Sequence, residues 1–414
     1  MSIAGKIQRA EILHDHHRNE EALVLLNEIL AEDPNCEEAH YQKTWVLLEI
    51  PGHKKEALES IHEAITLDPD FAPYTATKSI VLNRLDRSTE ALTAAQTAIA
   101  QDPDLPMAWI AKAGALGDKN EWAKAEEAAR KALELDPDET TAANLLTLYL
   151  RMQGKLDASS ENIEDLLSED AEDPFTHANA GWVALQQGDY AKAEKHCLES
   201  LRIDPENEYA RSGLLEAYKA RSLFYRLYLK WVFFIQKFAD KGQWIITIGI
   251  YIAYRVLRGA MNSIHPVLGA ILGILFLIFV FGSWIASGLG HFIILKDRIA
   301  RLTLKPAEKR DAWAVGGAFC LGLVIVIVGL TLAPIMVAAA GGVLMISSIP
   351  ASRIFLNGAL AGQVIFSLIT LSCYGLAVAT AATNEISYAW AAVAIGFLST
   401  WLGLIPNLEK DPDD

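Results

Sequence analysis

The feature that most constrains this chain is a repeat of about 34 residues in its first half. Five segments end in the pair Asp-Pro, and a divergent copy ends at Pro174; the other prolines are Pro34, Pro69, Pro103, Pro137 and Pro205. Successive prolines are 35, 34, 34, 37 and 31 residues apart. Because proline cannot continue a helix, each Asp-Pro is predicted to end one. A fixed period of this length is typical of stacked supersecondary units.

A small residue recurs at a fixed distance before these prolines. Alanine stands at positions 22, 57, 91, 125 and 193, at steps of 35, 34, 34 and 68, the last being twice 34. Alanine lets two antiparallel helices approach closely, and segments such as 118–125 and 186–193 supply Gly, Asp or Asn for the turns between them. A single hairpin cannot bury its apolar face, so the hairpins are expected to stack. We therefore predict an all-α helical-hairpin solenoid over residues 1–220.

These motifs resemble the tetratricopeptide repeat (TPR) family over about half the chain, as six units and a final helix at about 206–220. Trp109 stands where the family usually has an aromatic residue, whereas His177 replaces it in the last unit and the unit at about 138–173 is divergent. The family binds a peptide or helix in a concave groove lined by the first helix of each unit. The resemblance thus implies a partner-binding groove formed by Tyr41, Trp45, Ile80, Asn83, Arg84, Met107, Ile110, Phe175 and Trp182.

The implied groove is mainly apolar. Family members that clamp the C-terminal carboxylate of a chaperone use Lys, Asn and Arg at matching positions, so the composition here disfavours such a clamp. It favours a protein partner with an apolar or aromatic-rich segment. The alternative is that several of these side chains pack between helices instead.

Charge divides the chain in two. Residues 1–220 hold 21 Lys+Arg and 42 Asp+Glu, a net charge of −21, and the remainder holds 15 and 9, a net charge of +6. Clustered basic residues are needed to bind phosphates, so the acidic half disfavours nucleic acid as a partner. The N-terminus lacks the apolar core of a signal peptide, which predicts a cytosolic location for this half.

Residues 221–241 are predicted to form an amphipathic helix at the membrane surface. Four basic residues, Arg226, Lys230, Lys237 and Lys241, share one sector, and Trp231 with other aromatic residues occupies the opposite one. Such a helix suits the headgroup layer, where Lys and Arg meet anionic lipids. The alternative is a terminal repeat helix that packs its aromatic residues on the second half.

Residues 242–406 are predicted to form a polytopic bundle of transmembrane helices. About 20 apolar residues are needed to cross the hydrocarbon core. Six segments qualify or nearly do, the first being marginal because it is short and meets Arg255 and Arg258, so five spans are the alternative. The segments are Trp244–Tyr254, Val267–Leu289, Trp313–Leu332, Ile335–Ile349, Gly358–Ala382 and Ser387–Leu404.

The distribution of charge predicts the orientation. With the repeats inside, six spans place the basic loop 295–311 and the acidic tail 407–414 in the cytosol, in agreement with the positive-inside rule. Both termini are then cytosolic. The arrangement resembles bacterial membrane proteins that join cytosolic TPRs to a helical membrane domain, which implies the bacterial inner membrane. Gly269-x3-Gly273 and Gly358-x3-Gly362 are small-residue faces for helix packing, which leaves a homo-oligomer open.

No catalytic, cofactor or metal site is predicted. Ser287 and His291 are four residues apart, and His14 with His17 three apart, but packing and an exposed turn explain these pairs better than a hydrolytic dyad or a metal site. The sequence favours a non-enzymatic membrane-anchored scaffold. A TPR-regulated transporter or channel component, with the mild polar stripe Gln363, Ser367 and Thr370, is the alternative, and a membrane hydrolase is third.

Overall fold

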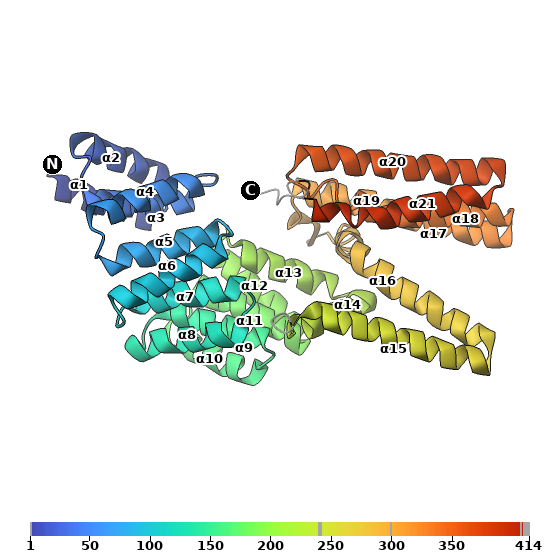
Figure 1. Cartoon of the computed structure of the whole chain (residues 1–414), viewed down its shortest axis with the longest axis horizontal. Coiled ribbons are helices and arrows are strands. Elements are labelled where there is room, and N and C mark those ends of the chain that lie inside the picture. Colours follow the sequence, from blue (N-terminus) through green and yellow to red (C-terminus); the bar gives the residue numbers. More distant parts are fainter. Residues whose placement is uncertain (1, 239–241, 299, 406–407, 409–414) are drawn as a thin grey trace. The chain divides into compact units, whose positions relative to one another are not determined.

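The structure is a computed structural model that describes residues 2–238, 242–298, 300–405 and 408. Over these residues the chain is helical and contains no strand (Figure 1). The chain divides into two compact units, and three helices, α12 (Tyr190–Ile203), α13 (Glu208–Lys219) and α14 (Leu223–Gln236), each have residues in both. The first unit comprises 1–187, 196–210 and 234–243, and the second comprises 188–195, 211–233 and 244–414.

The repeats fold as six helical hairpins and a following helix, as their spacing predicts. The first helices of the hairpins are α1 (Ile3–Asp15), α3 (Glu37–Glu49), α5 (Ala72–Arg84), α7 (Pro106–Asp118), α9 (Thr140–Met152) and α11 (Pro174–Gln187). The second helices are α2 (Asn19–Glu32), α4 (Lys54–Leu67), α6 (Ser88–Gln101), α8 (Trp122–Leu135), α10 (Leu156–Glu169) and α12 (Tyr190–Ile203). The following helix is α13 (Glu208–Lys219).

Local sequence explains where these helices end. Each of the first four second helices stops before the Asp of an Asp-Pro pair, and this Asp is extended because a residue before proline is disfavoured in the α region. Every turn inside a hairpin contains one residue in the left-handed region, which glycine, Asn and Asp tolerate best. These residues are His17, Gly52, Asp86, Asn120, Gly154 and Gly188.

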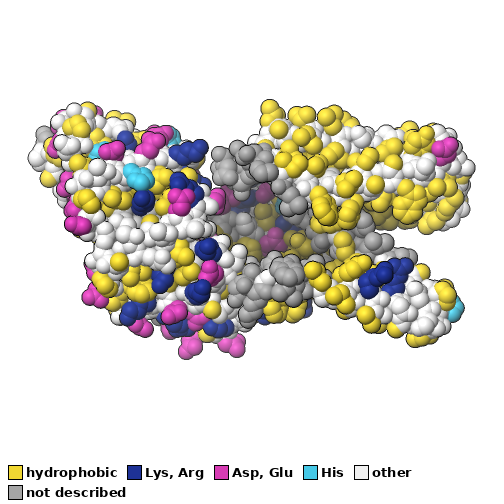
Figure 2. Space-filling model, viewed as in Figure 1, with side chains coloured by type: hydrophobic (Ala, Val, Ile, Leu, Met, Phe, Trp, Pro, Cys, Tyr) yellow, Lys and Arg dark blue, Asp and Glu magenta, His cyan; other side chains and the backbone are white. Residues whose placement is uncertain are grey.

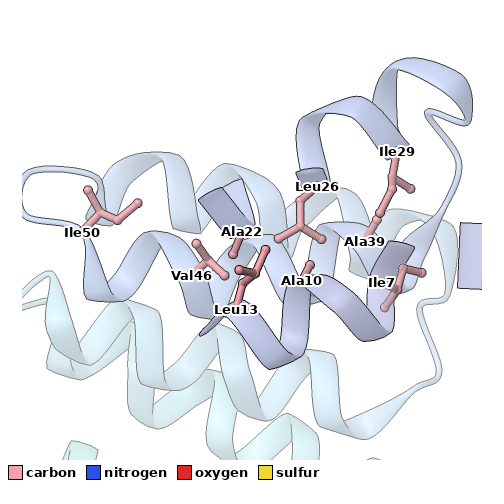
Figure 3. Close-up of a cluster of buried hydrophobic side chains, with 9 residues drawn as sticks. All are labelled: Ile7, Ala10, Leu13, Ala22, Leu26, Ile29, Ala39, Val46 and Ile50. Atoms are coloured by element: carbon pink, nitrogen blue, oxygen red, sulfur yellow. The ribbon is translucent and has the colours of Figure 1, made fainter. Parts of the chain in front are cut away.

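The alanines that repeat in the sequence lie in the core. Ala22, Ala57, Ala91, Ala125 and Ala193 are fully buried, which confirms their predicted place between helices. Figure 3 shows the first such core, in which Ala22 lies with Leu26 of α2 and Leu13 of α1. Each hairpin repeats this arrangement of small and branched apolar side chains, so the solenoid is held by many similar contacts.

The remaining helices lie wholly or mainly in the second unit. They are α14 (Leu223–Gln236), α15 (Gln243–Ile264), α16 (Pro266–Ile294), α17 (Pro306–Thr331), α18 (Ile335–Ile346), α19 (Ser348–Ala351), α20 (Leu360–Thr383) and α21 (Ile386–Ser399). α17 packs along α18, and α20 along α21, and α18 also contacts both helices of the second pair (Figure 1). Hydrophobic side chains cover much of the visible surface of these helices (Figure 2).

Two helices, α17 and α20, are long and apolar enough to cross a membrane, judged by length and composition over the described residues. α18 has 12 residues and α21 has 14. At 1.5 Å per residue these reach roughly 18 and 21 Å, short of the ~30 Å of a hydrocarbon core. The predicted bundle of five or six complete spans is therefore supported for two helices. The segments Trp244–Tyr254 and Val267–Leu289 lie within α15 and α16.

Glycines set the close packing in this unit. Gly322 of α17 and Gly341 of α18 face each other, and a Cβ on either would lie 2.7 Å from the carbonyl oxygen of the other. Gly273 of α16 faces Tyr254 of α15, so the Gly269-x3-Gly273 face is used within the chain. The second motif differs from expectation: α20 begins at Leu360, so Gly358 lies before the helix and shares no helical face with Gly362.

Candidate partner-binding groove

The first helices of the hairpins contact one another and form one layer of the repeat unit. α1 packs on α3, α5 on α7, α7 on α9 and α9 on α11. All nine predicted groove residues lie on this layer, from Tyr41 on α3 to Trp182 on α11. The predicted set lies on α3, α5, α7 and α11, with no member on α9, and three clusters can be described along the layer.

The first cluster is on α3. The Tyr41 ring lies 5.2 Å from the ring of Tyr74 on α5 and 6.3 Å, edge to face, from that of Trp45. Tyr74 is buried, and burial raises its pKa to about 12. Tyr41 also packs against the core between α3, α4 and α5, so it contributes to contact between hairpins, whereas Trp45 is half-buried beside it.

The second cluster joins α5 and α7. Met107 is half-buried, and its sulfur accepts a hydrogen bond of 3.8 Å from the Thr77 hydroxyl. The amide nitrogen of Asn83 lies 3.3 Å from the position that a Cβ on Gly114 would take. The Asn83 Oδ1 atom is buried without a hydrogen-bond partner in the described part of the chain.

Three more predicted residues border this second cluster. Ile80 and Ile110 are half-buried, and Arg84 at the end of α5 is exposed. The accessible surface here is thus apolar with one basic side chain at its edge.

The third cluster is aromatic and lies on α11 and α13. Trp182 stacks on Tyr209 with 5.5 Å between ring centroids, and its indole nitrogen donates a 3.0 Å hydrogen bond to the Tyr209 carbonyl. Phe175 stacks on Tyr209 as well, at 5.8 Å, and is 44% exposed. The structure thus joins the two predicted residues through Tyr209, which the sequence analysis did not identify.

A buried polar network supports this aromatic cluster. Asn144 on α9 donates to the Asp173 carboxylate at 2.9 Å, and Asn179 on α11 donates to the Asn144 side chain at 2.9 Å. The Tyr209 hydroxyl donates to Asn179 at 3.3 Å. Burial alone would raise the pKa of Asp173, but hydrogen bonds from Thr176, Asn144 and backbone amides outweigh it and lower that pKa. Burial raises the pKa of Tyr209.

Arg151 of α9 completes the network. It is 4% exposed, donates to the Tyr209 hydroxyl at 3.3 Å, and lies 5.4 Å from the centre of the Trp182 ring. Arg151 is the twelfth residue of α9, as Asn83 is the twelfth residue of α5. The divergence of the fifth repeat concealed this equivalence in the sequence, although an alignment of helix starts would have revealed it.

The predicted membrane-surface residues lie on or after α14. Arg226 donates to the Ala220 carbonyl at 2.5 Å and lies over the Tyr190 ring at 5.0 Å, so it is committed to contacts within the chain. Lys230 is exposed, and Trp231 meets Phe279 of α16 at 5.0 Å.

The remaining two basic positions end this segment. Lys237 is exposed and lies beside Gly154. Lys241 lies outside the described residues.

The structure also shows the surroundings of the two side-chain pairs considered in the sequence, His14 with His17 and Ser287 with His291. His14 bonds to the Asn19 side chain at 2.8 Å, and the described residues include no group of three or more His, Cys, Asp or Glu that could hold a metal ion. His291 is buried with its Nδ1 3.4 Å from an Asp311 oxygen, whereas Ser287 is exposed. The two members of the Ser-His pair thus have different surroundings.

Comparison with known proteins identifies the repeats. Family models described as tetratricopeptide repeat match residues 80–140 and 174–207. The chain contains tetratricopeptide repeats. No curated protein sequence matches the chain.

Solved TPR structures resemble the chain at low identity. A tetratricopeptide repeat protein from Parabacteroides merdae is 14% identical over 51% of this chain and 82% of its own, with a TM-score of 0.45. Pseudomonas aeruginosa pilF is 18% identical over 51% and 95%, with a TM-score of 0.40. PilW, described as a widely conserved type IV pilus biogenesis factor, is 19% identical over 51% and 98%, with a TM-score of 0.42.

Proposed function

We propose that this protein is a membrane-anchored, non-enzymatic scaffold whose TPR groove holds an apolar or aromatic-rich segment of a protein partner. The observation that carries the proposal is the aromatic cluster Phe175–Tyr209–Trp182. Its polar atoms are hydrogen-bonded inside the chain, while the Phe175 ring is 44% exposed. Aromatic side chains that are rigid and partly exposed are typical anchors of protein interfaces.

The membrane part of the proposal is supported by apolar helices. α17 and α20 provide the length and composition of an anchor. We propose the six-span topology with both termini in the cytosol of a bacterial inner membrane, and α14 at the headgroup layer. Leu223, Leu227 and Phe234 of α14 are exposed on the side that also carries the exposed Lys230, which gives the proposed contact both apolar and basic groups.

The groove is tested by replacing Phe175 with Ser and pulling down partners from detergent-solubilised native membranes. Val24 on α2, a second helix, is 59% exposed and supplies the matched control Val24→Ser. We expect Phe175→Ser to reduce recovery of stoichiometric partners about tenfold, as the loss of a ~1–2 kcal/mol anchor would. Both variants should stay in the membrane fraction. Undiminished recovery of partners with Phe175→Ser would refute the proposal that the groove binds them.

The topology is tested separately by single cysteines in a chain without Cys36, Cys197, Cys320 and Cys373. Glu385→Cys is expected to react with a membrane-impermeant maleimide in intact spheroplasts, because the proposed topology places it outside. Arg298→Cys should react only after permeabilisation. The opposite pattern would reject the orientation without touching the groove assignment.

The transporter alternative gains less support from the described side chains. Gln363 donates to the Asn357 carbonyl at 2.6 Å, and Thr370 donates to the Phe366 carbonyl at 2.8 Å. These donors are used by the backbone, as polar side chains in apolar helices often are. The scaffold therefore remains the function that the site supports best.

A further inference from the structure

A cavity of about 650 Å³ lies in the repeat unit, away from the predicted groove residues. It is lined by α6, α7 and α8, that is, by two successive second helices and the first helix between them. Trp109 and Leu116 of α7 contribute apolar surface to it. A cavity of this size is in the range that holds a small ligand or a few side chains of a peptide.

The cavity collects the basic residues of its region. Residues 88 to 150 contain five Lys or Arg, and all five line this one cavity: Lys112, Lys119, Lys124, Arg130 and Lys131. They do so in a half of the chain whose net charge is −21. Three glutamates, Glu121, Glu127 and Glu134, line the same cavity, so its five basic and three acidic residues give the lining a net charge of +2. A net positive lining in an acidic half of the chain favours an anionic partner.

Three of these cations are already paired. Lys124 lies 2.6 Å from Glu121, the residue before α8, and Lys131 lies 2.9 Å from Glu134 on α8. Arg130 is likewise 2.9 Å from Glu126. These neighbours reduce the charge that the α8 side of the cavity offers.

Lys112 of α7 and Lys119, which directly follows α7, differ from these three cations. Lys112 lies 4.7 Å over the Trp109 ring, and Lys119 has no ion pair among the residues that the structure describes. The Trp109 nitrogen donates to the Pro103 carbonyl at 2.9 Å, which fixes the ring beneath Lys112. This side of the cavity therefore presents Lys112 and Lys119 next to a rigid aromatic surface, with Glu121 close enough to Lys119 to interact with its charge.

We infer that this cavity is a second protein-binding site, which takes a short acidic segment carrying an aromatic or aliphatic side chain. Its carboxylates pair with Lys112 and Lys119, and its apolar side chain packs on Trp109 and Leu116. A short segment fits better than a long polyanion, because the surrounding net charge of −21 repels extended negative charge. The site is separate from the proposed groove, so a test of one does not decide the other.

The test uses full-length protein in detergent and a fluorescein-labelled synthetic 12-residue peptide with six Asp or Glu, one Phe and one Leu. Fluorescence polarisation at about 0.15 M salt measures its Kd. Lys112→Glu/Lys119→Glu should raise that Kd at least about tenfold. Lys54→Glu/Lys55→Glu on α4 changes the net charge equally and should change the Kd less than about twofold.

The controls separate the remaining outcomes. Lys112→Gln/Lys119→Gln removes both charges without inverting them and should weaken binding by a smaller factor, with the helical circular dichroism unchanged. A peptide with Gln and Asn in place of its acids should not bind. The inference is overturned if the acidic peptide does not bind, if the α4 control weakens it equally, or if inorganic phosphate competes with the same affinity, which would indicate an anion site only.

Discussion

The layer formed by the first helices of the hairpins is held together in two different ways along its length. Between α5 and α7 the contact is made by small apolar side chains, with Ala76 and Ala108 fully buried and Met107 packed beside them. Between α9, α11 and α13 it is made by buried polar groups, among them Asn144 and Asn179. Both stretches belong to the same helical-hairpin solenoid.

The difference teaches that one fold can be held by interchangeable or by mutually dependent contacts. Alanine contacts each contribute a little dispersion and burial, and the loss of one leaves the others intact. In a buried hydrogen-bond network, removal of one member leaves its partners unsatisfied in a dry environment, which costs more than the bond itself contributed. The polar stretch should therefore respond to single substitutions more sharply than the apolar stretch.

The largest effect is expected for Asp173→Ala. Its carboxylate accepts hydrogen bonds from Asn144, from the Thr176 hydroxyl and amide, and from the Phe175 amide. Their loss should destabilise α9 and α11 by about 3 kcal/mol. Hydrogen exchange of full-length protein should show amides of these helices exchanging about a hundredfold faster. Unchanged protection would mean that the network adds no stability.

The same carboxylate predicts a pH dependence. Because hydrogen bonds lower the pKa of folded Asp173, its contribution is present above the unfolded pKa, which is about 3.9, and is lost as the pH falls through the folded pKa. Protection of α9 and α11 should thus decline below about pH 4, and Asp173→Asn should lack this part of the decline.

A smaller effect is expected in the apolar stretch for Ala108→Leu. Ala108 is fully buried against Ala76 and Ala98, so three added carbons must displace α5 or α6. Overpacking of this kind costs about 2 kcal/mol. Exchange should accelerate in α5 to α7 while α9 and α11 keep their protection. Acceleration across the whole unit would show that the two stretches are not independent.

Sequence reasoning succeeded where a residue acts through its own properties. The prolines, the alanines and the left-handed turn residues act through backbone geometry and volume, so their spacing alone predicted the hairpins and the buried positions. Contacts between side chains of different helices were not predicted in this way. Nothing in the sequence indicates that Tyr209 would lie between Phe175 and Trp182, because this depends on how α13 docks on α11.

The apolar half illustrates a second limit. Hydropathy predicted apolar segments correctly, but helix length depends on where turns form. The segment Ile335–Ile349 divides between α18 and α19 at Ser347, and α18 is left with 12 residues. Ser347 and Ser348 are fully buried. The Ser347 hydroxyl donates to the Leu344 carbonyl, and the Ser348 hydroxyl donates to the Val315 carbonyl. Average hydropathy over a segment does not reveal such contacts.

A moderate effect is expected for Tyr209→Phe. The substitution keeps the stacked ring but removes the hydroxyl that donates to Asn179 and accepts from Arg151. The expected cost is about 1 kcal/mol, confined to α9 to α13. Protection should fall about fivefold there, and partner recovery in the pull-down should persist because the aromatic surface remains. Loss of recovery would make the hydroxyl part of the binding surface.

The smallest effect is expected where charges pair at the surface rather than inside a network. Glu90 pairs with Arg87 at 2.6 Å, and both side chains are exposed to solvent, which screens the pair, so Glu90→Ala should leave the protection of α6 almost unchanged. Glu126 provides the contrast: it is buried and accepts from Lys155 at 2.6 Å, from Gln153 at 2.7 Å and from Arg130 at 2.9 Å. Glu126→Ala should therefore reduce the protection of α8 and α9 clearly more than Glu90→Ala reduces that of α6. Equal losses of protection in the two variants would mean that burial does not distinguish the two carboxylates. The contrast between interchangeable and mutually dependent contacts would then not hold for ion pairs.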